Sequence, residues 1–210
     1  VIDSVIPPQS FELIRDRIAS ILSDEFGNQL ILTPNSVYSA PIYIERFISF
    51  DKNELPAVNV NLNNGDYQNQ SQLESEGVYI FNVDCYASAK SDTSESGDKK
   101  ATLKLQKLLG SCRAILENSQ YKTLGFATPF ISNRHIQSIT ISEPGRQDAL
   151  STVMGRLQMS VRVNELSEVK DADTLTDFLT TVKLFETEKG YFFQAANANN
   201  SFDYNLEIVL

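Results

Sequence analysis

The chain has 210 residues, 41% of them hydrophobic, with 12 Phe and 8 Tyr. This is enough apolar material for the core of one ordinary domain, alone or with a small appendage, and it excludes global disorder. The formal net charge is −9, and no apolar run approaches the roughly 18–20 residues that cross a bilayer, so we expect neither a membrane partner nor sequence-specific nucleic-acid binding.

The acidic charge is concentrated near the C-terminal end. Residues 1–163 carry 15 Lys and Arg against 18 Asp and Glu, whereas residues 164–210 carry 3 against 9. The composition changes at about Asn164, which predicts a body at residues 1–164 and an acidic, β-rich extension or intersubunit arm at 165–210. Residues 1–8 lack the basic and apolar regions of a signal peptide, so we expect assembly in the cytoplasm.

The first predicted element is an amphipathic helix with Ser10 as its N-cap and Gly27 as its stop. Its apolar residues recur at helical spacing and predict one buried stripe; they are Phe11, Ile14, Ile18, Ile21 and Leu22. Residues 28–53 predict short strands or extended loops, such as 30–32 and 42–44, because Pro34 and Pro41 interrupt them.

A strand is predicted to begin after Pro56 and to alternate small apolar residues with asparagine through Leu62. Residues 63–66, Asn-Asn-Gly-Asp, predict a turn, and residues 66–76 predict a polar, exposed connection. From Gly77 to Ala87 the residues alternate clearly, and both faces are partly apolar at the start. This pattern predicts a central strand.

The second predicted helix is capped by Asp98, and its apolar residues step by three and four along one face, which we expect to lie on the sheet; they are Ala101, Leu105, Leu108, Cys112 and Ile115. Residues 136–142 and 153–163 predict two strands separated by a turn at 143–146. The second of these strands has one wet face and favours antiparallel pairing.

The fold class predicted from these elements is α+β, with a mainly antiparallel sheet, two amphipathic helices packed on one face, and a C-terminal β extension. In the extension, residues 178–185 and 191–193 predict a hairpin with its turn at 186–190, and residues 204–210 predict a last strand. These segments have little core of their own, so we expect them to dock on the body or on a neighbouring subunit.

Few residues in the chain are suited to catalysis or metal binding. His135 is the single histidine, the two cysteines form no CxxC motif, and no glycine-rich phosphate loop occurs. Asp171 and Asp173 have the spacing that begins a calcium loop but lack its glycine and distal glutamate. We therefore expect no catalytic residues, no cofactor and no metal.

The basic residues of the second helix form the single basic cluster of the sequence; they are Lys99, Lys100, Lys104, Lys107 and Arg113. They are interpreted as the polar face of an amphipathic helix, with two alternatives: a nucleic-acid patch, or a surface that pairs with the acidic segment of a neighbour. Candidate interface residues are apolar or aromatic side chains in polar or core-poor segments, namely Tyr67, Leu73, Phe185, Tyr191, Phe192 and Phe193. The last three anchor an interface if exposed, or complete a hairpin if buried.

The order of elements is similar to that of tail terminator proteins of long-tailed bacteriophages. The resemblance covers residues 10–165 and is carried by residues 11–26, the strand Leu-Pro-Ala-Val-Asn-Val at 55–60, residues 77–87, residues 101–116 and residues 153–163. It implies an α+β subunit that forms a hexameric ring on the tail tube, stops tube polymerisation and joins the tail to the head-completion proteins. It also implies a place in the virion neck, with no catalysis and no cofactor.

The long segment 164–210 departs from this family, which puts the subunit contacts there in doubt: the segment is an arm, a small extra domain or a platform for a neck protein. Two other functions remain open. One is another neck, connector or baseplate protein of related fold. The other is a small enzyme, which would have to use His135 in a polar pocket.

Overall fold

The computed structural model describes residues 5–34, 37–69, 75–142, 145–147 and 150–165, together with four short strands between residues 178 and 208. The chain divides into two compact units, residues 1–172 and residues 173–210. Each unit is described by itself below.

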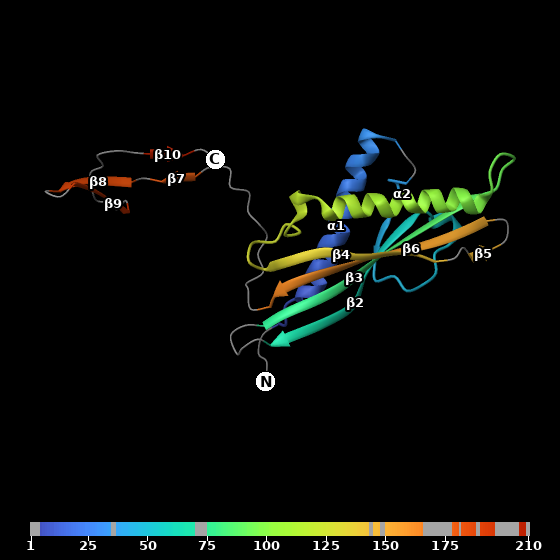
Figure 1. Cartoon of the computed structure of the whole chain (residues 1–210), viewed down its shortest axis with the longest axis horizontal. Helices are drawn as coiled ribbons and strands as arrows, with labels where there is room; N and C mark the ends of the chain where they lie inside the picture. Colours follow the sequence, from blue (N-terminus) through green and yellow to red (C-terminus); the bar gives the residue numbers. More distant parts are fainter. Residues whose placement is uncertain are drawn as a thin grey trace. The chain divides into compact units, whose positions relative to one another are not determined.

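The first unit is built on one sheet with the strand order β1-β2-β3-β6-β4, and a short strand β5 also pairs with β6 (Figure 1). The strands are β1 (Ile42–Ile44), β2 (Ala57–Asn69), β3 (Ser75–Lys90), β4 (Ile131–Ile141), β5 (Gly145–Gln147) and β6 (Leu150–Asn164). All pairs are antiparallel except β1 with β2. The predicted mainly antiparallel sheet is confirmed, with β3 in an interior position.

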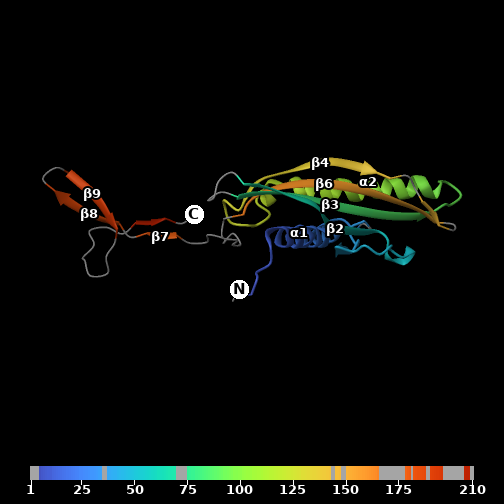
Figure 2. The same ribbon diagram turned by 90° about the horizontal axis from the view of Figure 1, so that it is seen from below.

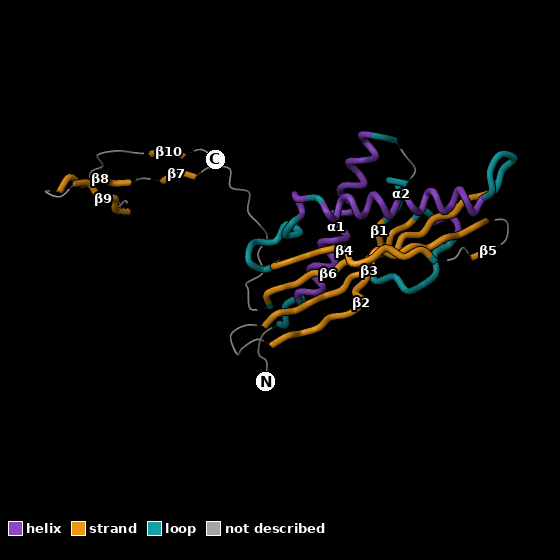
Figure 3. Tube along the Cα trace, in the orientation of Figure 1, coloured by secondary structure: helices purple, strands orange, loops and turns teal. Residues whose placement is uncertain are grey.

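Two long helices cover one face of this sheet, α1 (Ser10–Leu32) and α2 (Gly97–Glu117) (Figures 2 and 3). The ring of Phe11 on α1 lies 5.9 Å from that of Tyr79, and the sulfur of Cys112 on α2 lies 3.9 Å from that of Cys85. Tyr79 and Cys85 are six residues apart on β3 and therefore share a face. Both helices pack on that face, as predicted.

The hydrophobic core lies between the helices and this face. Its β3 residues are the predicted alternating set, which is fully or almost fully buried: Tyr79, Phe81, Val83, Cys85 and Ala87. The helices contribute buried stripes, including Ile14, Ile18, Leu22 and Phe26 from α1 and Leu105, Leu108 and Leu116 from α2. The helix α2 packs tightly on β6 at Gly155, where an added Cβ would lie 2.6 Å from Leu109 Cδ1.

The predicted stop of the first helix at Gly27 is wrong. The helix continues to Leu32 and ends before Pro34, so residues 30–32, predicted as a short strand, form its last turn. Gly27 is tolerated because it lies on the solvent side, where a Cβ would meet nothing within 4 Å. The predicted cap at Ser10 is also wrong: Gln9 is the N-cap, and its backbone N–H donates to the Glu12 carboxylate over 2.7 Å.

The predicted turn at residues 63–66 is instead a β-bulge. The register between β2 and β3 shifts between Leu62 and Asn64, and pairing then continues to Asn69. A bulge and a turn both favour Asn and Gly, because each needs a backbone that bends locally. The second helix begins at Gly97 with Ser96 as its N-cap instead of Asp98, and β4 begins five residues before the predicted position. Gly145 opens strand β5 within the predicted turn at 143–146.

The second unit contains four short strands, β7 (Phe178–Thr180), β8 (Val182–Thr187), β9 (Gly190–Ala195) and β10 (Leu206–Ile208). Strands β8 and β9 form an antiparallel hairpin, which confirms the predicted one, and β7 pairs with β10. The segment predicted as one strand, 178–185, is divided between β7 and β8.

Candidate functional site

The sheet face that the helices leave uncovered is polar and is crossed by hydrogen-bonded rows. In one row, Asn82 Nδ2 donates to Asn61 Oδ1 over 3.3 Å, and Gln158 Nε2 donates to Asn82 Oδ1 over 3.2 Å. These three residues lie opposite one another on β2, β3 and β6. Because the row spans three strands, it fixes the pairing register through side chains as well as through the backbone.

A second row carries charge. Arg156 on β6 donates to the Asp84 carboxylate through Nε and Nη2, over 2.6 and 2.9 Å. The Asp84 side chain is 4% exposed, whereas that of Arg156 is 40% exposed. Asn61 Nδ2 adds a third donor to the carboxylate at 3.2 Å. The buried charge is therefore satisfied on three sides, which is the condition for tolerating it.

The loop at residues 45–56 lies against the same face and is fixed at its base. Arg46 forms a two-pronged ion pair with Glu54, with both N–O distances at 2.8 Å. Its guanidinium lies 4.7 Å from the Tyr43 ring centroid and 4.3 Å from that of Phe50. The hydrogen bond from Arg46 lowers the pKa of Glu54. The Phe50 ring in turn lies 4.7 Å from that of Tyr86 on the open face.

Asn59 on β2 holds the backbone of this loop. The Arg46 N–H donates to Asn59 Oδ1, and Asn59 Nδ2 donates to the Arg46 carbonyl, both over 3.0 Å. The side-chain amide thus mimics a backbone pairing partner. In contrast to this base, the adjacent Phe47 and Ile48 are 85% and 78% exposed. The loop therefore presents two large apolar side chains from a rigid support, a combination typical of interaction surfaces.

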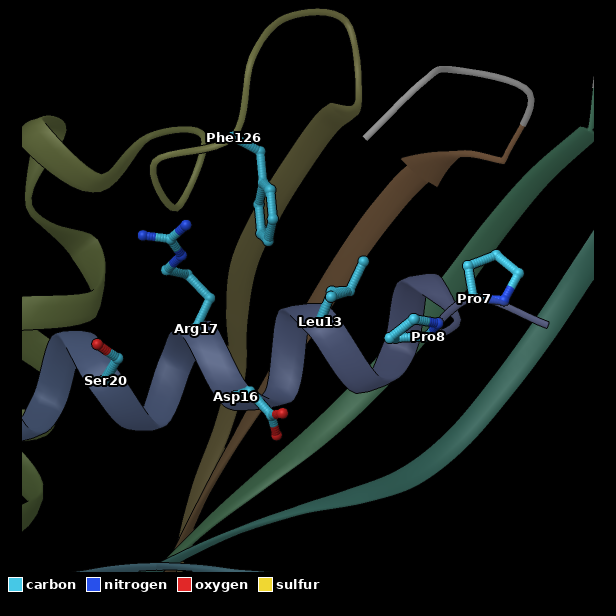
Figure 4. Close-up of a pocket in the computed structure, with 7 residues that line it drawn as sticks. All are labelled: Pro7, Pro8, Leu13, Asp16, Arg17, Ser20 and Phe126. Carbon is cyan, nitrogen blue, oxygen red and sulfur yellow. The ribbon is translucent and has the colours of Figure 1, made fainter. Parts of the chain in front are cut away.

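A groove of about 680 Å³ lies beside α1, within the first unit (Figure 4). Its lining is mainly apolar, with Pro7, Pro8, Leu13 and Phe126, and Asp16, Arg17 and Ser20 complete it. The Arg17 guanidinium lies 5.3 Å from the Phe126 ring centroid, within cation–π range. The groove has the size of an ordinary binding pocket but is open to solvent along one side. The positive charge in its lining is the Arg17 guanidinium beside the Phe126 ring.

The outer edges of the sheet are interrupted. On one side, the short strand β1 pairs with β2 at Val58–Val60. Beyond this pairing, the outward backbone N–H of Leu62 on β2 donates to the Glu45 side chain over 2.8 Å, and the bulge follows directly. On β4, register shifts occur between Ile131 and Asn133 and between Ile136 and Ser138. Bulges, and side chains that accept hydrogen bonds from edge N–H groups, are means by which proteins prevent edge-to-edge sheet growth. Contacts with other subunits through the faces and loops are therefore favoured over contacts that extend the sheet.

The predicted interface residues have different outcomes. Tyr67 is 59% exposed at the far end of β2, with its ring 5.8 Å from that of Tyr79. Leu73 lies outside the described residues. In the β8–β9 hairpin, Phe185 lies opposite Phe192, with Tyr191 and Phe193 on either side of Phe192; the exposure of their side chains lies outside what the structure describes. Their role remains a prediction.

His135 is exposed on the edge strand β4, opposite Ser160 of β6. Among the residues described, no group of three or more His, Cys, Asp or Glu residues could hold a metal, and no helix is long and apolar enough to cross a membrane. Asp171 and Asp173 lie outside the described residues. Three residues of the basic cluster pair with acids near α2: Lys99 with Glu95, Lys100 with Asp92 and Arg113 with Glu117.

Glu165 is bound to the body, although it is the first residue of the predicted extension. It accepts hydrogen bonds from Ser10 Oγ, over 2.6 Å, and from the Tyr79 hydroxyl. Burial and this hydrogen bond raise the pKa of Tyr79. The bonds join the start of α1, the centre of the sheet and the end of β6. Because the first unit extends to residue 172, a cut intended to remove the second unit alone belongs after residue 172 rather than after Asn164.

Comparison of the chain with protein-family models and with curated proteins gave no match. The functional proposals therefore rest on the geometry described above and on the resemblance noted in the sequence.

The sequence reasoning missed two features. One is the ion pair between Arg46 and Glu54, which lie eight residues apart in a segment without regular periodicity. The other is the set of polar rows, which can be recognised only when the strand register is known. The sequence signal for the rows was present in the Asn-x-Asn alternation at residues 59–63.

Proposed function

We propose that this protein is a ring-forming structural subunit of a phage virion. In this role it caps the end of the tail tube, terminates tube polymerisation and joins the tail to the head. The observation that carries the proposal is the contrast between the two faces of the sheet. One face is covered by the helices (Figure 3), and the other carries rows of hydrogen-bonded polar side chains.

A ring of such subunits would place the helices outside and the open faces toward the axis. The open face suits a wall in contact with water, because its buried polar groups already have partners. Two of its arginines are paired with acids: Arg156 lies with Asp84, and Arg162 Nη1 lies 3.4 Å from Glu76 Oε2. A wall with paired charges offers few free cations to phosphate, so DNA would pass along it without being held.

The exposed apolar side chains support assembly. Ile31 and Leu32 at the end of α1 and Phe47 and Ile48 in the 45–56 loop are each more than 70% exposed. Single exposed apolar residues are ordinary, but adjacent pairs on fixed elements are typical of contact surfaces. In this proposal they are covered by neighbouring subunits, by tail-tube protein or by head-completion protein.

In this proposal the protein is not an enzyme and needs no cofactor. It assembles in the host cytoplasm as a homo-oligomer, expected to be a hexamer, and takes its place in the neck of the virion. A different role, as a neck, connector or baseplate protein, would require the same features of the subunit: one face covered by helices, one polar face and exposed apolar contact residues. Location on the particle by electron microscopy separates that role from tail termination.

The test is light scattering and negative-stain imaging of the purified full chain, alone and mixed with tail-tube protein. The expected result is a closed ring, free in solution or seated at tube ends, together with tubes that stop growing when the protein is added. A monomer at all concentrations that leaves tube length unchanged would reject the proposal. A ring that binds heads but never tubes would favour the connector role.

A further inference from the structure

The 45–56 loop and the groove beside α1 form a complementary pair on the surface of one chain. The tip of the loop carries two exposed apolar side chains, Phe47 and Ile48. The groove is lined by two prolines, a leucine and a phenylalanine. The loop lies toward the end of the sheet that carries β5 (Figures 1 and 2). The groove is lined by Pro7, Pro8 and Leu13, at the start of α1. One copy thus carries both parts at separate places.

The base of the loop makes the tip ready to bind. The Arg46–Glu54 fork, the two rings around Arg46 and the Asn59 clamp hold the residue directly before Phe47. Immobilising a loop on binding costs free energy, and a loop already fixed in the free protein avoids part of that cost. Exposed aromatic and aliphatic side chains on such a support are suited to act as anchors.

Both parts carry charges of either sign, and one pair of opposite charges would attract across the contact. Asp51 is exposed in the loop, three residues after Ile48. On the groove, Arg17 lies over the Phe126 ring. An apolar tip entering between Leu13 and Phe126 would bring the loop's carboxylate toward a guanidinium, and desolvation on burial would strengthen that attraction.

We propose that the Phe47–Ile48 tip of one copy inserts into the groove beside α1 of the next copy. Tip and groove are different surfaces, so the contact is heterologous, and repetition of such a contact gives a closed ring or an open helix. The interrupted edges, which are β4 and the part of β2 beyond its pairing with β1, are consistent with this mode, because assembly then needs no sheet extension. This inference rests on the proposed self-assembly and identifies its contact residues.

The first experiment measures self-association of full-length variants by light scattering. Replacing Phe47 and Ile48 by serine should weaken association about tenfold or more, since two anchors of this type contribute at least about 1.4 kcal/mol. The matched control is Leu103→Ser, which removes an exposed apolar side chain from α2 and should leave association within about twofold. Equal association of the double variant and the wild type overturns the contact.

The second experiment tests the contact directly by disulfide trapping. Full-length Phe47→Cys is mixed with full-length Ser20→Cys under mild oxidation, and the expected product is a covalent dimer of one copy of each. Cys85 and Cys112 are fully buried and should not compete. The mixture of Leu103→Cys with Ser20→Cys is the control, and it should give no dimer above background.

The outcomes separate this contact from the proposed function. Rings that form without the Phe47–Ser20 product, and that survive the double serine variant, overturn the contact and leave the ring function standing. The specific product without closed rings supports the contact and rejects the ring. A monomer that gives no product, with or without tail tubes, overturns both. A groove occupied by a different partner would appear as tube binding lost in Ser20→Phe while self-association stays unchanged, and this also overturns the contact.

Discussion

The two faces of strand β3 use the same backbone but are stabilised by different means. The face with Phe81 and Val83 is buried under α1 and α2 by apolar packing. On the other face, Asn82 and Asp84 are also almost fully buried, although neither α1 nor α2 covers them, because neighbouring polar side chains fill the space around them. Burial alone therefore does not distinguish a core from a polar wall, whereas the type of partner does.

This difference has energetic consequences. Apolar packing is non-directional, and its loss appears as cavity volume and lost burial. A buried polar row depends on direction, and its loss leaves a donor or acceptor without a partner. Second substitutions should therefore restore the lost stability in different ways on the two faces. At a core position, stability returns when the lost side-chain volume is replaced, and at a polar position it returns when the partner left without a hydrogen bond is also removed.

Phe81→Ala should produce the largest effect. The side chain is fully buried, and truncation of a buried phenylalanine costs about 3–5 kcal/mol of unfolding free energy. Urea denaturation followed by circular dichroism measures this loss. Leu103→Ala is the control, since that side chain is 53% exposed and should change stability by no more than about 0.5 kcal/mol. A Phe81 variant as stable as the control would contradict the assignment of this face to the core.

Arg156→Leu should cost about 2–3 kcal/mol, because it leaves the buried Asp84 carboxylate without its cation. The exposure of Arg156 and the remaining donor from Asn61 keep the loss below that of a fully buried pair. The diagnostic comparison is the double variant Arg156→Leu/Asp84→Leu, which should recover most of the lost stability in the same denaturation experiment. Additive losses in the double variant would show that the row is not a coupled unit.

Gly155→Ala should cost about 1–2 kcal/mol by overpacking. The added Cβ would lie 2.6 Å from Leu109 Cδ1 and 3.3 Å from Leu105 Cδ2, and both leucines are buried. Thermal unfolding should show a lowered midpoint, and Gly155→Ala/Leu109→Ala should lose less stability than the sum of its single variants. If Gly155→Ala alone is neutral, α2 is free to move away from β6.

The sequence predicted those parts of the fold in which a regular period reports burial on one side. Alternation identified the core face of β3 and the strand β6, and helical spacing identified the buried stripe of α2. The burial of Asn82 and Asp84 was not predicted, because alternation assigns these polar residues to the face opposite the core without showing what covers that face. Their burial depends on residues more than twenty positions away, which no local pattern contains.

Local signals failed where tertiary packing outweighed them. The Asn-Asn-Gly sequence at residues 63–65 is compatible with a turn, but pairing with β3 continues through it as a bulge. Glycine commonly ends a helix, but at Gly27 the burial of the preceding Phe26 favours continuation, and the helix ends at Leu32, before Pro34. Of the candidate interface, Tyr67 was predictable as an exposed aromatic, whereas Phe47 was hidden among the residues of an irregular loop.

Gly27→Ala should stabilise the protein by up to about 1 kcal/mol, the difference in helix propensity between the two residues. The position is helical, and an added Cβ meets nothing within 4 Å. Gly110→Ala in α2 is a matched case with equal space and should behave alike. Both variants are compared with Gly155→Ala by thermal unfolding. A loss of stability at Gly27 would indicate that the helix ends there in solution.

The smallest effect is a pH dependence of the 45–56 loop. The hydrogen bond from Arg46 lowers the pKa of Glu54 from its ordinary 4.5, so the ionised form is favoured when the loop is in place. A group with a lowered folded pKa contributes stability above its ordinary pKa and loses it as the pH falls through the folded value. Carboxyl NMR of Glu54 should therefore show a midpoint below 4.5, and Arg46→Met should move it back toward 4.5.

If the loop tip is the subunit anchor, self-association should weaken over the same acidic interval. The base then loses its ion pair, and the tip must be ordered on binding. Glu54→Gln should make association weaker at neutral pH and should reduce its pH dependence between about 3 and 6, whereas the exposed control Glu95→Gln should keep the wild-type profile. Unchanged association of Glu54→Gln at neutral pH would show that the rigid base contributes nothing to the contact, even if the tip itself does.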